Sequence, residues 1–216
     1  MFYTTNSQDD GFGAQYQRRI QTYIYCKQHN LKFLYRPFEN VAHNYDSEQN
    51  FINKLEKMVN LKNNIKNINN MKINTIDFGS IVMKYCDQNI DKVCDSEHMQ
   101  YIKECFWKNK ERDYFKNKKI NIAIHIRREN SHDKGQAGLR IITPNDYYLN
   151  IMNIIRKKYT DRDLQFHIYS QGNINNFNIL NNKDVIFHLD EDICKTFIEL
   201  VAADILVTSP SSLSYT

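Results

Sequence analysis

His125, Arg127 and Arg128 are the side chains with the clearest chemistry in the sequence, because they end an apolar run that begins at Ile120. An arginine guanidinium presents a fixed fork of donors to phosphate and keeps its charge. A histidine two residues earlier can hydrogen-bond a base or a sugar. Since side chains alternate along a strand, His125 and Arg127 share one face and Arg128 takes the other. The pattern indicates an anion-binding site, and the alternative is a strand end with surface ion pairs.

A serine-rich segment near the end of the sequence offers a second group of anion ligands. Residues 209–214 read Ser-Pro-Ser-Ser-Leu-Ser and follow the apolar run 204–208. Hydroxyls and free backbone N–H groups at the start of a helix can bind phosphate. Ser211 and Ser212 are therefore candidates for holding a diphosphate, and the alternative is that the serines only cap a helix.

Asp190-Glu191-Asp192 follows a third apolar run and offers carboxylates for a metal ion. Asp-x-Asp after such a run is how one large class of sugar transferases holds Mg²⁺ or Mn²⁺ on a nucleotide diphosphate, and oxygen ligands suit these ions. The other interpretation is that Asp190 or Asp192 caps the following helix. Capping is favoured, because the arginines and serines already supply an anion site without a metal.

Strand and helix patterns alternate through the second half of the sequence, which predicts a parallel sheet built from right-handed βαβ units. The expected strands cover 120–128, 164–169, 184–189 and 204–208, and the expected helices cover 144–159, 174–180 and 192–202, with Thr143 as the N-cap of the first. A further helix is expected after the serines. The carboxyl ends of parallel strands lie along one edge, so Ser170 and Gln171 should join the arginines there.

The first half of the sequence has a weaker version of the same pattern. A short strand at 2–5 precedes Gly11-Phe12-Gly13 and a helix at 14–29; this arrangement either lets the backbone approach a ligand or forms a plain tight turn. Further strands are expected at 31–35 and 73–78, and further helices at 47–60 and 95–114, with a Lys- and Asn-rich segment at 60–74 that is either a surface loop or a ragged helix. The fold class is α/β, with domains at 1–117 and 118–216.

Composition places the 216-residue chain among ordinary globular proteins, with 41% hydrophobic and 25% charged residues. A net charge of +4 favours an anionic ligand but is too small to indicate nucleic acid. Five cysteines without a Cys-x-x-Cys pair predict reduced thiols. No apolar run approaches the ~20 residues that span a bilayer, so a cytoplasmic protein without a membrane segment is expected, unless an anchor or signal has been removed.

These motifs, in this order, resemble the fucosyltransferase superfamily, which comprises the α1,2-, α1,6- and protein O-fucosyltransferases. The resemblance rests on His-x-Arg-Arg at 125–128, Ser-Gln-Gly at 170–172 and Ala-Asp-Ile-Leu-Val-Thr-Ser-Pro-Ser-Ser-Leu-Ser at 203–214. Gly-Phe-Gly-Ala-Gln at 11–15 is similar to the family's N-terminal Gly-x-Gly-x-Gln turn. The family implies a GT-B architecture, in which two Rossmann-like domains with parallel sheets face each other across a cleft. Residues 1–117 would lie on the acceptor side and 118–216 would bind the nucleotide sugar, with a truncated or minimal C-terminal domain.

The resemblance also implies an activity: an inverting, metal-independent transfer of fucose from GDP-fucose to a hydroxyl of a glycan or a protein. GDP-fucose is then a substrate, and neither a cofactor nor a metal is expected. Arg127 would bind the diphosphate and stabilise it as the leaving group, and His125 would lie near the guanosine. The other candidate donor-binding residues, from the resemblance and the strand ends together, are Gly11, Gly13, Arg140, Ser170, Gln171, Thr196, Ser211 and Ser212.

The transfer needs a base that removes the proton of the acceptor hydroxyl. Glu129, His132 and Asp133 follow the arginines in the same loop, and Asp9 or Asp10 could reach the acceptor from the first domain. Asp133 is the chosen candidate, although each of these side chains is equally compatible with a solvated loop charge.

Two other functions stay open from the sequence. One is a metal-dependent GT-A transferase that uses Asp190 and Asp192. The other is a nucleotide-sugar-binding protein without catalysis, since Asn130 and Thr196 stand where family members often carry aspartate. In the family the second of these aspartates binds guanine, so another nucleotide is also compatible with the sequence.

Overall fold

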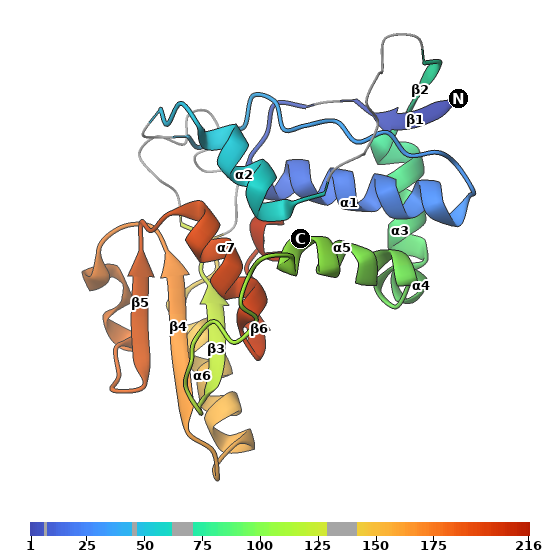
Figure 1. Cartoon of the computed structure of the whole chain (residues 1–216). Helices are drawn as coiled ribbons and strands as arrows, with labels where there is room; N and C mark the ends of the chain where they lie inside the picture. Colours follow the sequence, from blue (N-terminus) through green and yellow to red (C-terminus); the bar gives the residue numbers. More distant parts are fainter. Residues whose placement is uncertain (7, 45–46, 62–70, 129–141) are drawn as a thin grey trace. The chain divides into compact units, whose positions relative to one another are not determined.

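The computed structural model describes residues 1–6, 8–44, 47–61, 71–128 and 142–216, and has a mixed α/β fold with parallel sheets (Figure 1). The chain divides into two compact units, one of residues 1–110 with Thr216 and one of residues 111–215. The boundary expected from the sequence follows residue 117. Residues 111–117 instead lie with the second unit, because Asn117 donates a hydrogen bond to Asn121 over 3.0 Å and the Phe115 ring packs on His167.

The second unit contains a four-stranded parallel sheet in the order β5-β4-β3-β6. Its strands are β3 (Ile120–His125), β4 (Leu164–Ser170), β5 (Val185–Leu189) and β6 (Ile205–Val207). The chain moves from β3 through β4 to β5, and then returns to the other side of β3 to form β6. This reversal creates a topological switch point between β3 and β6, the place where open parallel sheets bind ligands at their carboxyl ends.

One face of this sheet is apolar and is covered by α6 (Asn145–Lys158) (Figure 1). Every second residue of β3, beginning at Ile122, joins one buried cluster together with side chains of β4 and α6. The fully buried members are Ile122, Ile124, Ile126, Tyr148, Met152, Phe166, Ile168 and Phe177. Since burying one such side chain is worth about 1.5–3 kcal/mol, this face is the main source of stability in the unit.

The opposite face is covered by α7 (Ile193–Ala202) and is much more polar (Figure 1). Among the described residues, the apolar cluster on this face is small and consists of Ala123, Tyr169 and Leu200 with their neighbours. Buried polar residues of the strands and of α7 occupy other positions, namely Asn121, His125, Gln165, His167 and Glu199. Burying polar groups is costly unless they find partners, so this face is where hydrogen-bonded networks are expected.

One helix of the second unit begins later than expected. The N-cap of α6 is Pro144 rather than Thr143, because Pro144 keeps an extended conformation with ψ of 155° and helical geometry begins at Asn145. The helix expected after the serines, incomplete at the end of the sequence, is represented by a 3-10 turn, η3 (Ser212–Ser214). Another 3-10 segment, η2 (Ile174–Leu180), follows β4.

The first unit has a two-stranded parallel sheet of β1 (Phe2–Thr5) and β2 (Ile73–Ile76). The strand expected at 31–35 forms only an isolated bridge, between Phe33 and Tyr3. The helical segments are α1 (Phe12–Gln28), α2 (Phe51–Val59), η1 (Phe78–Met83), α3 (Lys84–Gln88), α4 (Ile90–Cys94) and α5 (Glu97–Trp107). The π-helical segment η1 and the short α3 and α4 have no counterpart among the sequence predictions.

Candidate functional site at the carboxyl ends of β3 and β6

Ser209 links the two strands that flank the switch point. Its Oγ accepts a hydrogen bond from the backbone N–H of Arg127 over 3.2 Å and lies 3.2 Å from His125 Nδ1. The Arg127 N–H can only donate, so the serine hydroxyl is free to donate its own proton to a neutral His125. The end of β6 therefore fixes both the histidine ring and the backbone that carries the arginine.

His125 is held as a neutral imidazole by its surroundings. The residue is only 7% exposed, and burial, followed by the charge of Arg127, lowers its pKa from 6.5 to about 4. A neutral ring accepts the Ser209 proton at Nδ1 and retains a hydrogen on Nε2. The His125 ring thus contacts Ser209 inside the unit, and through this serine it helps to hold the backbone at Arg127.

Arg127 spans the ends of two neighbouring strands. Its Nη1 donates to Gln171 Oε1 over 3.1 Å and to the carbonyl oxygen of Arg128 over 2.8 Å. Ser170, the last residue of β4, donates its hydroxyl proton to the carbonyl of Ile126 over 2.7 Å. These contacts bring Arg127, Ser170 and Gln171 together at one edge of the sheet, as the alternation of strands and helices predicts.

Arg128 points to the other face of the sheet, as expected from strand alternation. Its Nη1 donates to the carbonyl of Thr143 over 3.1 Å, its Nη2 donates to Asn145, and its guanidinium lies 5.7 Å from the centre of the Phe177 ring. Arg128 therefore fastens the start of α6 to the end of β3. It has a structural task that Arg127 does not share.

The two aspartates that could hold a metal both bond to backbone N–H groups. Asp192 Oδ1 accepts hydrogen bonds of 3.0 Å from the N–H groups of Cys194 and Lys195, which makes Asp192 the N-cap of α7. Asp190 Oδ2 accepts a 3.1 Å bond from the N–H of Gly172, so it ties the loop after β5 to the loop after β4. These contacts are those of the capping interpretation that the sequence favours.

Replacing Asp192 with alanine is expected to destabilise the second unit by about 1 kcal/mol, because a lost N-cap leaves helix N–H groups without a partner. Urea unfolding followed by circular dichroism measures this loss. The exposed Asp161→Ala exchange is the matched control and should change stability by less than about 0.5 kcal/mol. Equal stabilities of the two variants would contradict the capping role.

The remaining described candidates of the second unit lie after β6 and on α7. Ser211 donates its backbone N–H to the carbonyl of Ser209, and Ser212 begins η3. Thr196 is partly exposed on α7, where its N–H bonds to the carbonyl of Asp192. Ser211 and Ser212 adjoin Ser209 in the chain, whereas Thr196 lies on α7.

Gly11 and Gly13 belong to the first unit. Gly11 is the N-cap of α1 and donates its N–H to Asp10 Oδ1 over 2.7 Å, and Gly13 is buried within the first turn of that helix. Gln15, also from the resembling segment, donates to the carbonyls of Glu39 and Asp10 over 2.7 and 3.1 Å. The glycine segment thus starts a helix, and Gln15 holds neighbouring loops.

Several candidates lie outside the described residues. They include the proposed base Asp133, its alternatives Glu129 and His132, and also Asn130 and Arg140.

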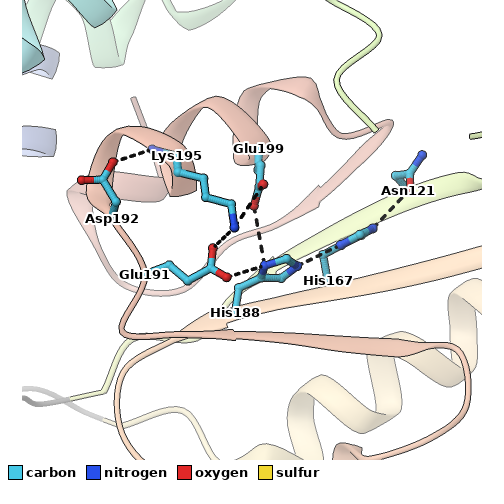
Figure 2. A network of polar contacts seen from close by, with 7 residues as sticks. All are labelled: Asn121, His167, His188, Glu191, Asp192, Lys195 and Glu199. Atoms are coloured by element: carbon cyan, nitrogen blue, oxygen red, sulfur yellow. Dashed lines mark hydrogen bonds and ion pairs between the residues drawn. The ribbon is translucent and has the colours of Figure 1, made fainter. Parts of the chain in front are cut away.

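A second group of polar residues was not recognised from the sequence. His188, Glu191, Lys195 and Glu199 form a network on the α7 face, and His167 extends it to Asn121 (Figure 2). The sequence contains one signal of this network, because Asn121 and His167 each lie between two apolar residues of an expected strand. The spacing of three and eleven residues from His188 to the glutamates gave no such signal.

Comparison with known proteins gives no match: no family model fits the chain, and no curated protein or solved structure is significantly similar to it. Among the helices that the structure describes, none combines the length and the apolar character needed to cross a membrane.

Proposed function

We propose that the second unit binds a nucleoside-diphosphate sugar at the carboxyl ends of β3 and β6, and that GDP-fucose is the donor. The observation that carries the proposal is the position of Arg127 beside the switch point, where Ser209 holds its backbone and Gln171 contacts its guanidinium. A guanidinium there is suited to a diphosphate. Ser211 and Ser212 would add hydroxyl donors on the β6 side.

The proposed reaction is a single displacement with inversion at the anomeric carbon. An oxygen of an acceptor hydroxyl, from a glycan or a protein, attacks this carbon while the bond to the diphosphate breaks. Asp133 takes the acceptor's proton, and Arg127 stabilises the charge that develops on the departing GDP. The GT-B arrangement of two Rossmann-like domains, with residues of the first unit on the acceptor side, is part of the same proposal.

The structure supports a donor site without a metal over the GT-A alternative. Asp190 and Asp192 accept backbone hydrogen bonds that hold the loop after β5 and the start of α7. Binding a metal through Asp192 Oδ1 would compete with the cap of that helix. Donor binding that disappears in EDTA and returns with Mn²⁺ would favour the GT-A alternative instead.

A nucleotide screen by thermal unfolding tests the donor. GDP and GDP-fucose are expected to stabilise the full chain, by about 2.7 kcal/mol at a concentration 100 times the Kd. UDP, CMP and their sugars serve as matched comparisons. Stabilisation by one of these, without an effect of GDP, would show that the fucosyl assignment is wrong.

Catalysis is tested separately from binding. The enzyme is expected to release GDP from GDP-fucose in the presence of an acceptor glycan or peptide library, and an Asp133→Asn variant is expected to bind the donor but release GDP at least about 100-fold more slowly. GDP-fucose binding without any release would identify the chain as a binding protein.

A further inference from the structure

His188 is surrounded by carboxylates on the α7 face of the sheet (Figure 2). Its Nδ1 lies 3.1 Å from Glu191 Oε1 and 3.7 Å from Glu199 Oε2. The Lys195 ammonium group lies 2.8 Å from Glu191 Oε2 and 3.9 Å from Glu199 Oε1. One ligand atom from each of His188, Glu191 and Glu199 can be chosen so that all three lie within 4.8 Å of one another.

The hydrogen bonds behind His188 determine which of its nitrogens carries a proton. Asn121 Nδ2 faces the backbone carbonyl of Lys119 over 3.1 Å, and a carbonyl can only accept, so the amide oxygen of Asn121 faces His167. His167 Nε2 must therefore donate to Asn121 Oδ1, at 3.2 Å. The amide of Asn117 agrees with this orientation, because it donates to the same oxygen.

The same alternation of donors and acceptors continues from His167 to His188. His167 is 4% exposed, and its ring nitrogens face Asn121 and His188 rather than a carboxylate, so its ring is neutral. With a proton on Nε2, the Nδ1 of His167 is an acceptor, and His188 Nε2 donates to it over 3.1 Å. The other nitrogen of His188, Nδ1, is then left facing two carboxylates, and only a cation at this position, either a proton or a metal ion, satisfies all three groups.

The carboxylates also favour a cation. Both oxygens of the Glu191 carboxylate face nitrogen atoms, since Oε1 lies 3.1 Å from His188 Nδ1 and Oε2 lies 2.8 Å from Lys195 Nζ. Glu199 is 4% exposed, and its carboxylate oxygens lie 3.7 Å from His188 Nδ1 and 3.9 Å from Lys195 Nζ, longer than the 2.7–2.9 Å of charge-assisted bonds.

We propose that His188, Glu191 and Glu199 form a three-ligand site for a divalent transition-metal ion, and that the Lys195 ammonium group competes with the ion for the same carboxylates. Two ligand atoms on one tetrahedral Zn²⁺ are about 3.4 Å apart, close to the 3.1 and 3.7 Å that separate His188 Nδ1 from the two glutamates. The imidazole ligand favours Zn²⁺ over Mg²⁺ or Ca²⁺, which take oxygen ligands. His167 and Asn121 supply the outer hydrogen bonds that orient a metal-binding histidine.

Lys195 gives the site its competing cation. It is an exposed residue whose side chain is 45% accessible, so the ammonium group can turn to solvent when an ion enters. Without it, the cluster would hold two carboxylates and one imidazole, a set of ligands that lacks only the ion. The lysine thus lowers the affinity for the metal and stabilises the network without one.

Titration of the metal-free full chain with Zn²⁺, followed by calorimetry, tests the proposal. Wild-type protein is expected to bind one Zn²⁺ per chain, and His188→Gln and Glu191→Gln are each expected to weaken binding by about 10- to 100-fold. Mg²⁺ should not compete at equal concentration. His29→Gln and Cys94→Ser, which change an exposed histidine and an exposed thiol outside the cluster, are the controls and should leave the affinity unchanged.

A Lys195→Gln variant supplies the sharpest measurement, because the exposed position tolerates the exchange. It should bind Zn²⁺ about fivefold more tightly than wild type, whereas the exposed Lys92→Gln control should not. Imidazole ¹⁵N spectra should show the signal of His188 Nδ1 shifting with Zn²⁺ while Nε2 keeps its proton. Absence of Zn²⁺ binding, equal loss in the His29 control, or weaker binding by Lys195→Gln would overturn the proposal. Zn²⁺ affinity is read independently of GDP binding, so the donor proposal can fail without affecting this one.

Discussion

An Arg127→Ala variant is expected to bind GDP about 10- to 100-fold more weakly than the wild-type chain. The estimate follows from the free energy of hydrogen bonds to charged groups, about 1.5–3 kcal/mol, of which each 1.4 kcal/mol corresponds to a factor of ten. The guanidinium lies at the switch point, where it already bonds to Gln171, and a diphosphate there would gain a forked set of donors. Isothermal titration with GDP measures the loss.

Two further variants separate the geometry of this arginine from its charge. Arg127→Lys keeps a positive charge but lacks the planar fork, so it should bind GDP with intermediate affinity. Arg156→Ala removes an arginine that pairs with Asp184 over 2.8 and 2.9 Å, just before the start of β5 at the amino-terminal edge of the sheet. That control should lower stability and leave GDP affinity within about twofold. If Arg127→Ala also stays within twofold, Arg127 does not bind the diphosphate.

The parallel sheet of the second unit could be predicted from sequence because its two signals are local. Alternating isoleucines mark β3, and strand and helix patterns follow one another without interruption through β4, β5, α7 and β6. The first unit was less predictable. The run 31–35 has the composition of a strand, but pairing requires a neighbour, and it makes only one bridge, at Phe33. Its short π-helical and α-helical segments follow tertiary packing rather than a clear periodicity.

The candidate site was predictable to the level of the sheet edge, and less so residue by residue. Strand alternation placed His125 and Arg127 on one face, but the role of Ser209 depends on β6 lying next to β3, a long-range pairing that no local pattern reveals. The same limit applies to His188. Glu191 follows His188 by three residues in the loop before α7, but Glu199 reaches the histidine only because α7 packs back over the sheet, so the cluster depends on the fold and not on the spacing.

Buried His125 should make the stability of the second unit fall as the pH is lowered. The pKa of His125 is 6.5 in the unfolded chain and about 4 in the folded one, so the unfolded state binds more protons between these values. Its contribution is therefore fully present above pH 6.5 and is lost progressively as the pH falls towards 4. At 1.36 kcal/mol per pKa unit the loss reaches up to about 3 kcal/mol.

A His125→Gln variant isolates this contribution, since glutamine can still bond to Ser209 but takes up no proton. Urea unfolding at pH 7.5, 6.0 and 5.0 should give a steeper loss of stability for wild type than for the variant, even if the variant is less stable at pH 7.5. His29→Gln, at an exposed position, should retain the wild-type slope. Parallel slopes for wild type and His125→Gln would mean that the imidazole already takes up its proton in the folded state. A protonated ring would then donate from Nδ1 to Ser209 Oγ, and this oxygen would still accept the backbone N–H of Arg127.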